Sequence, residues 1–262
     1  MIEIRHCTGL DELEACVQLQ TETWGYDPND VIPRKAFLVT QKIGGQVIGA
    51  FDTEIPACGK DGEAHRLIGF AMAMAGVKTK PGGAPQAYLH SHMLAVKPAC
   101  RNRGLGMRLK REQRREALAR GLTHMEWTFD PLEIKNAYLN LCKLGAIVRE
   151  YRADFYGATT SQLQGGLPTD RLLAEWRMDA PRVEAALAGK PAAAFVVEER
   201  ISVPAAVNAW KVSESERERA RAVQTANRER FQQAFARGLA VLGFVRDGEG
   251  NGTFELGYPP EA

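Results

Sequence analysis

The sequence lacks any uninterrupted apolar run of eighteen residues, so no segment is predicted to span a membrane. Its first residues, MIEIRHCTG, carry charges at positions 3 and 5 and lack the apolar core of a secretory signal. An excess of either charge is also missing, because 34 Lys and Arg against 32 Asp and Glu give +2. Such a balance offers no general attraction for nucleic acid or an anionic membrane. These absences predict a cytoplasmic protein that binds neither.

Paired cysteines are missing as well. The five cysteines are scattered, odd in number and form no C-x-x-C pair: Cys7, Cys16, Cys58, Cys100 and Cys142. This pattern favours reduced thiols over a disulfide framework or a zinc site, and we expect no metal. A chain of 262 residues with 45% hydrophobic content can bury a full core.

Alternating and helix-periodic segments follow one another over residues 1–157. Strands are predicted at 2–8, 46–54, 65–77, 86–96 and 124–131, a strand or bent pair of strands at 146–157, and helices at 9–25, 34–44, 104–121 and 132–145. Turn-rich connectors separate them at 55–64 and 78–85. This order predicts a mixed α/β layer structure.

Residues 158–262 are predicted as a C-terminal extension, beginning with the turn-rich stretch 159–170. Strands are expected at 171–178 and 194–204, and a hairpin at 239–258. Between them a long helix is predicted to open at Ser213 and Glu216, which have capping-box spacing, with a buried stripe of Ala220, Val223, Phe231, Ala234 and Phe235. The extension could be a partial second copy, an oligomerisation element (a homodimer is one such arrangement) or a wall of the acceptor site.

The segment YLHSHMLAVKPACRNRGLGMRLK, residues 88–110, combines a predicted strand, a glycine-containing turn and a basic helix. Glycines at 104 and 106 let a phosphate approach backbone amides at a helix start, although a bare G-x-G by itself favours an ordinary strand-to-helix turn. Neither a Walker loop nor a complete dinucleotide fingerprint is present. His90 and His92, two apart on a strand, are predicted to share a face with Leu94 and Val96. Two imidazoles beside an anion site favour acid–base chemistry.

The run LAVKPACRNRGLGMRL resembles the acyl-CoA-binding motif of the GNAT acyltransferase superfamily, L-x-V-x-P-x-x-[RQ]-x-x-G-x-[GA]. Six positions are in register: Leu94, Val96, Pro98, Arg101, Gly104 and Gly106. The order of predicted elements over residues 1–157 is similar to that of the family. The resemblance implies a mixed, mostly antiparallel sheet flanked by helices, with acetyl-CoA or another acyl-CoA as co-substrate.

The resemblance also implies roles for individual residues. The main chain of one strand would hold the pantetheine arm, through Met93, Leu94, Ala95 and Val96. The turn would cradle the CoA pyrophosphate, through Arg101, Asn102, Arg103, Gly104, Leu105, Gly106 and Met107. HSHMLAV resembles the H-x-H-x-L-x-V run of the serotonin N-acetyltransferase family, in which the pair helps to take the proton from the amine. It therefore implies that His90 and His92 are catalytic.

Two features depart from the family pattern. Many members carry a tyrosine, as acid towards the CoA sulfur, where this chain has Leu141. Tyr138, one helical turn earlier, is the candidate replacement, with a core position as the alternative. The family's asparagine is also out of register, since Ile134 stands there. Asn136, the candidate cofactor-binding residue, lies two residues further on.

The acceptor is predicted to meet the loop TWGYDPNDVIP, which lies where GNAT enzymes close over their substrate. Three of its side chains are candidate contacts, although a plain exposed turn is the alternative: Trp24, Tyr26 and Asp27. The resulting hypothesis is an N-acyltransferase that moves acetyl, or a small acyl group such as succinyl, to a small amine such as an amino acid. A catalytically silent CoA-binding sensor or scaffold is the alternative. A nucleic-acid module using the cations at 101–120 is disfavoured by the balanced charge.

Overall fold

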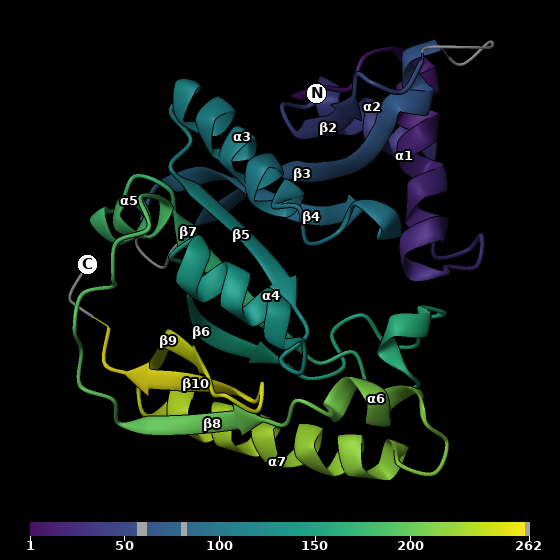
Figure 1. Cartoon of the computed structure of the whole chain (residues 1–262). Helices are drawn as coiled ribbons and strands as arrows, with labels where there is room; N and C mark the ends of the chain where they lie inside the picture. Colours follow the sequence, from purple (N-terminus) through teal and green to yellow (C-terminus); the bar gives the residue numbers. More distant parts are fainter. Residues whose placement is uncertain (57–61, 80–82, 260–262) are drawn as a thin grey trace. The chain divides into compact units, whose positions relative to one another are not determined.

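The computed structural model describes residues 1–56, 62–79 and 83–259, and it divides into two compact units, residues 1–125 and 126–262 (Figure 1). Cys58 and parts of the connectors at 55–64 and 78–85 lie outside the described residues. None of the described helices combines the length and apolar character needed to cross a bilayer.

The first unit is an antiparallel sheet with strand order β1-β2-β3-β4, flanked by three helices. Along the chain the elements are β1 (Ile2–His6), α1 (Gly9–Trp24), α2 (Arg34–Lys42), β2 (Gln46–Asp52), β3 (Leu67–Thr79), β4 (Pro85–Val96) and α3 (Leu105–Ala119). A short 3-10 turn, Gly62–Arg66, precedes β3. The predicted order of these elements is confirmed.

Two hydrophobic clusters separate the faces of this sheet. On one face the apolar stripes of α1 and α2, with Leu13, Leu19 and Phe37, pack on Phe70 and Met93 of the sheet. On the other face Leu105 and Leu109 of α3 pack on strand residues that include Ile48, Ile68 and Ala71, with Leu94 and Val96 beside them. We call these the α1 face and the α3 face. Residues 46–51 of β2 and 67–73 of β3 therefore alternate between two buried surfaces, as strands covered by helices on both sides do.

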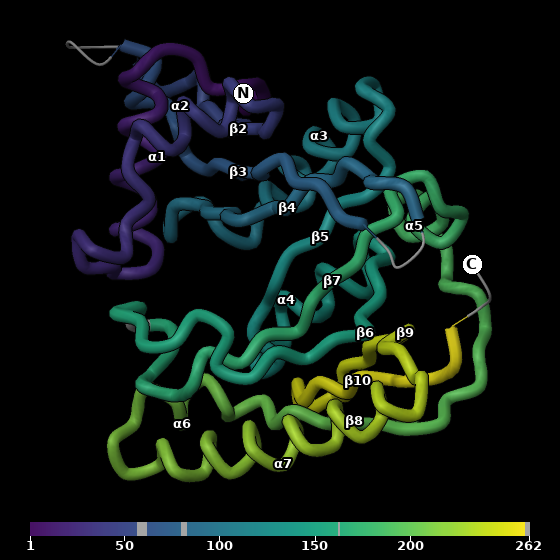
Figure 2. The backbone as a smooth tube through the Cα atoms, turned by 180° about the vertical axis from the view of Figure 1, so that it is seen from behind, coloured from purple at the N-terminus to yellow at the C-terminus, as the bar shows by residue number. Residues whose placement is uncertain are grey.

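The second unit also combines a sheet with helices, and its strand order is β5-β7-β6-β9-β10-β8. The pairs β6–β7, β9–β10 and β8–β10 are antiparallel. The elements are β5 (His124–Phe129, which begins at the end of the first unit), α4 (Ile134–Tyr138), β6 (Ile147–Arg152), β7 (Arg171–Arg177), α5 (Pro181–Leu187), β8 (Glu199–Val203), α6 (Val207–Val212), α7 (Arg217–Ala236), β9 (Ala240–Arg246) and β10 (Gly252–Gly257). Helix α7 lies along β8 in both views (Figures 1 and 2). The predicted class, α/β with a mostly antiparallel sheet flanked by helices, is confirmed.

Several local predictions for residues 126–262 are wrong. The predicted capping box does not form, because α7 begins after Glu216 without a side-chain cap and the Ser213 hydroxyl pairs with Ser215. By contrast, the helix expected at 132–145 is found, as α4 continued without a break by a π-helical turn, Leu139–Lys143. The strand expected at 194–204 is paired only over β8, and α5 and α6 occupy stretches where no helix was predicted. Short helices carry too few turns for a clear apolar period.

The predicted burial of α7 residues is confirmed for Ala220, Phe231 and Ala234, whereas Val223 and Phe235 are only half-buried. Gln224 and Asn227 are buried in addition. Each amide donates to a backbone carbonyl, of Pro168 at 2.9 Å and of Ser202 at 3.0 Å. A polar side chain is buried when such a partner compensates its lost hydration, and a hydrophobic pattern does not reveal that partner.

A buried carboxylate ties α7 to the sheet of the second unit. Asp170 is fully buried and accepts two hydrogen bonds from the fork of Arg228, both at 2.9 Å. The Tyr151 hydroxyl donates to the same carboxylate. Burial and the neighbouring carboxylate raise the pKa of Tyr151, so this phenol stays protonated as a donor.

We expect Arg228→Lys to lower the free energy of unfolding by about 1.5–3 kcal/mol. The lysine ammonium can keep only one of the two charge-assisted hydrogen bonds that the guanidinium donates to the buried Asp170. Urea denaturation measures this change. Arg221→Lys is the matched control on the same helix, since Arg221 pairs at 3.2 Å with Glu218, whose side chain is 81% exposed. It should change the free energy by less than about 0.5 kcal/mol. Equal losses in the two variants would contradict the importance of the fork at Asp170.

Candidate functional site

Strand β4 contains a β-bulge at His92. Two successive residues of β3, Met72 and Ala73, pair with Met93 and Ser91, so His92 is the extra residue on β4. On the amino-terminal side of the bulge, Ser91 contacts α3, and on the carboxy-terminal side Leu94 contacts α3. Ser91 and Leu94 are three positions apart, whereas two residues on one face of a regular strand differ by an even number of positions. The bulge therefore reverses the alternation along the strand.

The prediction that His90 and His92 share a face with Leu94 and Val96 is wrong, because of this bulge. His90 pairs with Met74, which packs on the α1-face cluster. The two imidazole centroids are 6.2 Å apart, as for neighbours on one side of a strand. Both histidines thus lie on the α1 face, which Met93 shares. The pair itself stays together as predicted.

The two histidines are half-buried. Burial lowers the pKa of His92 below its ordinary 6.5, because desolvation disfavours the charged imidazolium. A neutral imidazole near neutral pH has a free lone pair and can accept a proton. His92 therefore has the protonation state that a general base needs.

The turn between β4 and α3 presents backbone amides at a helix start. Gly104 has φ +75° and Asn102 has φ +61°, both in the left-handed region. α3 begins at Leu105, and its first amides have no acceptor within the helix. A Cβ built on Gly104 meets no atom within 4 Å, so the space in front of the turn is open. Open, amide-lined space at the positive end of a helix dipole suits a phosphate.

The cations of this turn are not equivalent. Arg103 is exposed, and Arg101 is exposed with its Nε donating to the Val96 carbonyl at 3.3 Å. Arg108 reaches back to the carbonyl of Ile2, 2.7 Å away, and so ties α3 to β1. Gly106 and Met107 are half-buried within the first turn of α3. The structure therefore leaves Arg101 and Arg103 as the exposed arginines of the turn.

The predicted acceptor residues lie at the end of α1 and in the loop that follows it. Trp24 and Tyr26 stack with ring centroids 5.6 Å apart and pack against the α1-face cluster, whereas Asp27 is exposed. A residue absent from the prediction organises this loop. The fully buried Gln20 amide donates to the Ile32 carbonyl at 3.0 Å and accepts from the Ile32 amide at 2.9 Å. The aromatic pair thus lies on the same side of the sheet as the two histidines.

Tyr138 and Asn136 lie on α4 of the second unit. Asn136 is exposed, and Tyr138 is half-buried with the Lys143 ammonium 5.4 Å from its ring centroid. Leu141, at the position of the family's tyrosine, is buried as a core residue. The roles of Tyr138 and Asn136 stay predictions.

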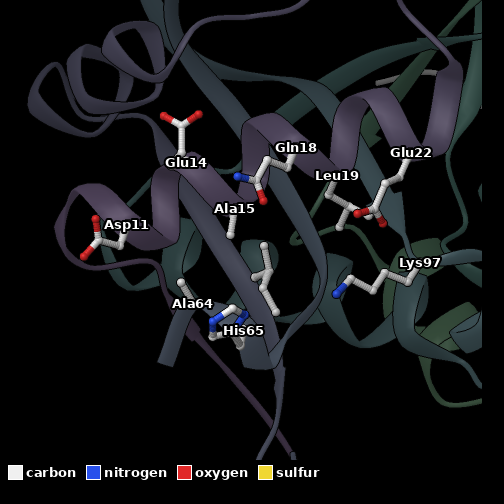
Figure 3. Close-up of a pocket in the computed structure, with 10 residues that line it drawn as sticks. Asp11, Glu14, Ala15, Gln18, Leu19, Glu22, Ala64, His65 and Lys97 are labelled. Atoms are coloured by element: carbon white, nitrogen blue, oxygen red, sulfur yellow. The ribbon is translucent and has the colours of Figure 1, made fainter. Parts of the chain in front are cut away.

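A cavity of about 260 Å³ in the first unit lies between α1, the 3-10 turn before β3 and Lys97 (Figure 3). Asp11, Glu14 and Glu22 line it from α1, and His65 and Lys97 line it from the other side. It contains none of the predicted site residues, although Lys97 directly follows β4 and precedes the turn. None of the sequence motifs predicted that these charged residues line a common cavity.

No protein-family model matches the sequence, and comparison with proteins of curated function also finds no match. Solved structures do resemble the chain. NAA60 from Arabidopsis thaliana, solved with acetyl-CoA, shares 16% identity over 68% of this chain and 99% of its own, with a TM-score of 0.52. The ribosomal-protein-S18-alanine N-acetyltransferase from Escherichia coli shares 15% identity over 69% and 96%, with a TM-score of 0.50.

A GNAT-family structure from Desulfovibrio desulfuricans is similar to the same degree, with 11% identity over 68% of this chain, 99% of its own and a TM-score of 0.50. At such identities the likeness concerns the fold. It agrees with the order of elements read from the sequence and with the antiparallel strands found in the structure. The chain has the fold of the GNAT N-acetyltransferases.

Proposed function

We propose that this protein is an acyl-CoA-dependent N-acyltransferase that acts on the amine of a small molecule such as an amino acid. The observation that carries the proposal is one strand, β4, which bears a histidine pair and is joined by residues 97–104 to the open start of α3 with its free backbone amides. The first feature suits proton removal and the second suits a pyrophosphate. Both occur in a fold shared with acetyltransferases.

Acyl-CoA would be held by the main chain of Met93–Val96 and by the turn 101–107, and it would supply an activated thioester carbonyl. The open space at Gly104 and the exposed arginines of the turn fit its phosphates. His92 or His90 would take one proton from the ammonium of the acceptor. The freed nitrogen lone pair would then attack the thioester carbonyl, and the carbon–sulfur bond would break with its electron pair leaving on the CoA sulfur. The nitrogen would lose its second proton to solvent, which leaves the neutral amide. The CoA thiolate would take its proton from solvent, because a thiolate is a stable leaving group.

The acceptor is proposed to approach on the α1 face. This is the face towards which the bulge turns His90 and His92, and it also carries the Trp24–Tyr26 stack. Stacked rings offer an apolar contact to the part of the acceptor beyond its amine. We place the reaction in the cytoplasm, where acyl-CoA is available and thiols stay reduced.

A thiol-release assay tests the function. Acetyl-CoA and succinyl-CoA are each offered with a panel of amines that includes amino acids of both hands and a peptide with an N-terminal alanine. The expected result is CoA release that requires one class of acceptor, with the amide product identified by mass. CoA binding in calorimetry without release for any acceptor would favour the sensor or scaffold instead. Absence of CoA binding would contradict both.

A further inference from the structure

Beneath the bulge, on the α3 face, lies a buried polar cluster. It has no part in the functions proposed for the turn at 101–107, which we call the phosphate turn, or for the histidine pair. The ammonium of Lys110 lies 2.7 Å from the Ser91 hydroxyl, and that hydroxyl donates to the Gln113 side-chain carbonyl at 3.2 Å. Lys110, Ser91 and Gln113 are 3%, 5% and 0% exposed. Burial lowers the pKa of Lys110 to about 7, which reflects the cost of removing an ammonium from water.

A buried ammonium is not the most stable way to fill a helix–sheet interface. Apolar side chains of similar volume fill such positions at lower or equal cost. Leu105 and Leu109 of the same helix show that apolar packing serves elsewhere on this face. A lysine at position 110 therefore needs another reason, and in several proteins buried polar groups select one register over another.

The cluster depends on the register of β4. Side chains alternate along a strand, so a change of one residue in pairing turns each of them to the opposite face. Without the bulge, residues 90 and 92 would lie on the α3 face with Leu94 and Val96, and Ser91 would turn away from Lys110. The ammonium would then lose the hydroxyl and meet an imidazole. Only the bulged register matches Ser91 with Lys110 and Gln113 while it keeps both histidines on the α1 face.

We propose that Lys110, Ser91 and Gln113 form a register lock that holds the bulge of β4 and thereby directs His90 and His92 to the α1 face. The three are positioning residues, and the role of the histidines in this inference rests on the proposed function. Lys110 lies in the second turn of α3, the helix that begins at the phosphate turn. The lock thus connects the strand with the histidines to the element that would hold the pyrophosphate.

The register itself is the first readout, and it requires no activity. In NMR spectra of the full chain, wild type should show cross-strand contacts between Ala73 and Ser91 and between Met72 and Met93. Lys110→Met removes the charge at similar length and should add a second set of contacts, in which Ala73 meets His92. An unchanged single set of contacts in this variant would overturn the lock. This result stands whether or not the proposed function is correct.

Turnover is the second readout. A shift of about 1 Å at a reacting group can cost about 10²-fold, so Lys110→Met should lower kcat by about that factor with KM for acyl-CoA unchanged. In the His90→Gln/His92→Gln background it should cause no further loss. Lys35→Met, the same change at an exposed position of α2, is the matched control and should leave kcat unchanged. Equal losses in both backgrounds would overturn the inference, because Lys110 would then act without the histidines.

Ser91 provides milder variants in case Lys110→Met fails to fold. Ser91→Ala removes the hydroxyl and should reproduce both effects, whereas Ser91→Thr keeps it and should retain the single register and most of the turnover. Equal behaviour of the alanine and threonine variants would contradict a role for the hydroxyl. A wild-type chain that shows no turnover with any acceptor would instead refute the proposed function, and the NMR readout would still decide the lock.

Discussion

Changing His90 and His92 together to glutamine is expected to lower turnover by about 10²–10⁴-fold, the usual contribution of a general base. An ammonium has to lose a proton before its nitrogen can attack the thioester carbonyl, and glutamine cannot accept that proton. The amide keeps the polarity and approximate size of the imidazole. Because the phosphate turn is unchanged, acyl-CoA affinity in calorimetry should be unchanged as well. His65→Gln, at an exposed histidine of the same unit, is the matched control.

The pH profile gives the sign of this effect. The base is active when neutral, so wild-type turnover should fall as pH decreases through the pKa of His92, which burial places below 6.5. The same lowered pKa means that the folded state binds fewer protons than the unfolded state below pH 6.5. The free energy of unfolding should therefore decrease as pH falls through this range. The acidic limb of the rate profile should flatten in the double variant. Normal turnover of that variant at pH 6.5, with only a lower melting temperature, would show that the imidazoles are structural.

Gly104→Val is expected to weaken acyl-CoA binding by at least about 100-fold. Each lost charge-assisted hydrogen bond to a phosphate costs about 1.5–3 kcal/mol, and the valine side chain would fill the open space in front of several amides. A β-branched residue also resists the left-handed backbone at this position, where φ is +75°. Isothermal titration calorimetry with acetyl-CoA measures the loss.

Gly121 supplies a matched control for the backbone strain. It has φ +76°, lies just beyond the other end of α3 and likewise has no atom within 4 Å of a built Cβ. Gly121→Val should therefore cost similar stability and leave acetyl-CoA affinity unchanged. If both variants lost affinity equally, strain in α3 would explain the effect. If Gly104→Val bound as wild type does, the phosphate assignment of the turn would be wrong.

The sequence by itself determined the elements that form from local patterns. The apolar runs of β2 and β3, the alternation in β1 and the apolar residues at helical spacing in α1 predicted these elements. A strand covered on both faces is apolar along its length, and a packed helix needs apolar residues near a period of about 3.6. The motif from Leu94 to Gly106 predicted the GNAT fold that solved structures confirm. The left-handed turn at Gly104 follows from the same motif, since glycine adopts this conformation without strain.

Only the tertiary structure decided which way the histidines point. Alternation predicted the α3 face, and the bulge at His92 places them on the α1 face instead. A bulge depends on the register against β3 and on partners far along the chain, and here Lys110 and Gln113 of α3 hold Ser91 from the opposite side. For the same reason the sequence did not predict that Gln20 and Asp170 are buried, because their burial is compensated by hydrogen bonds to residues outside their own segments. Local periodicity records which residues avoid water, whereas long-range polar contacts select among the registers and rotamers that this periodicity allows.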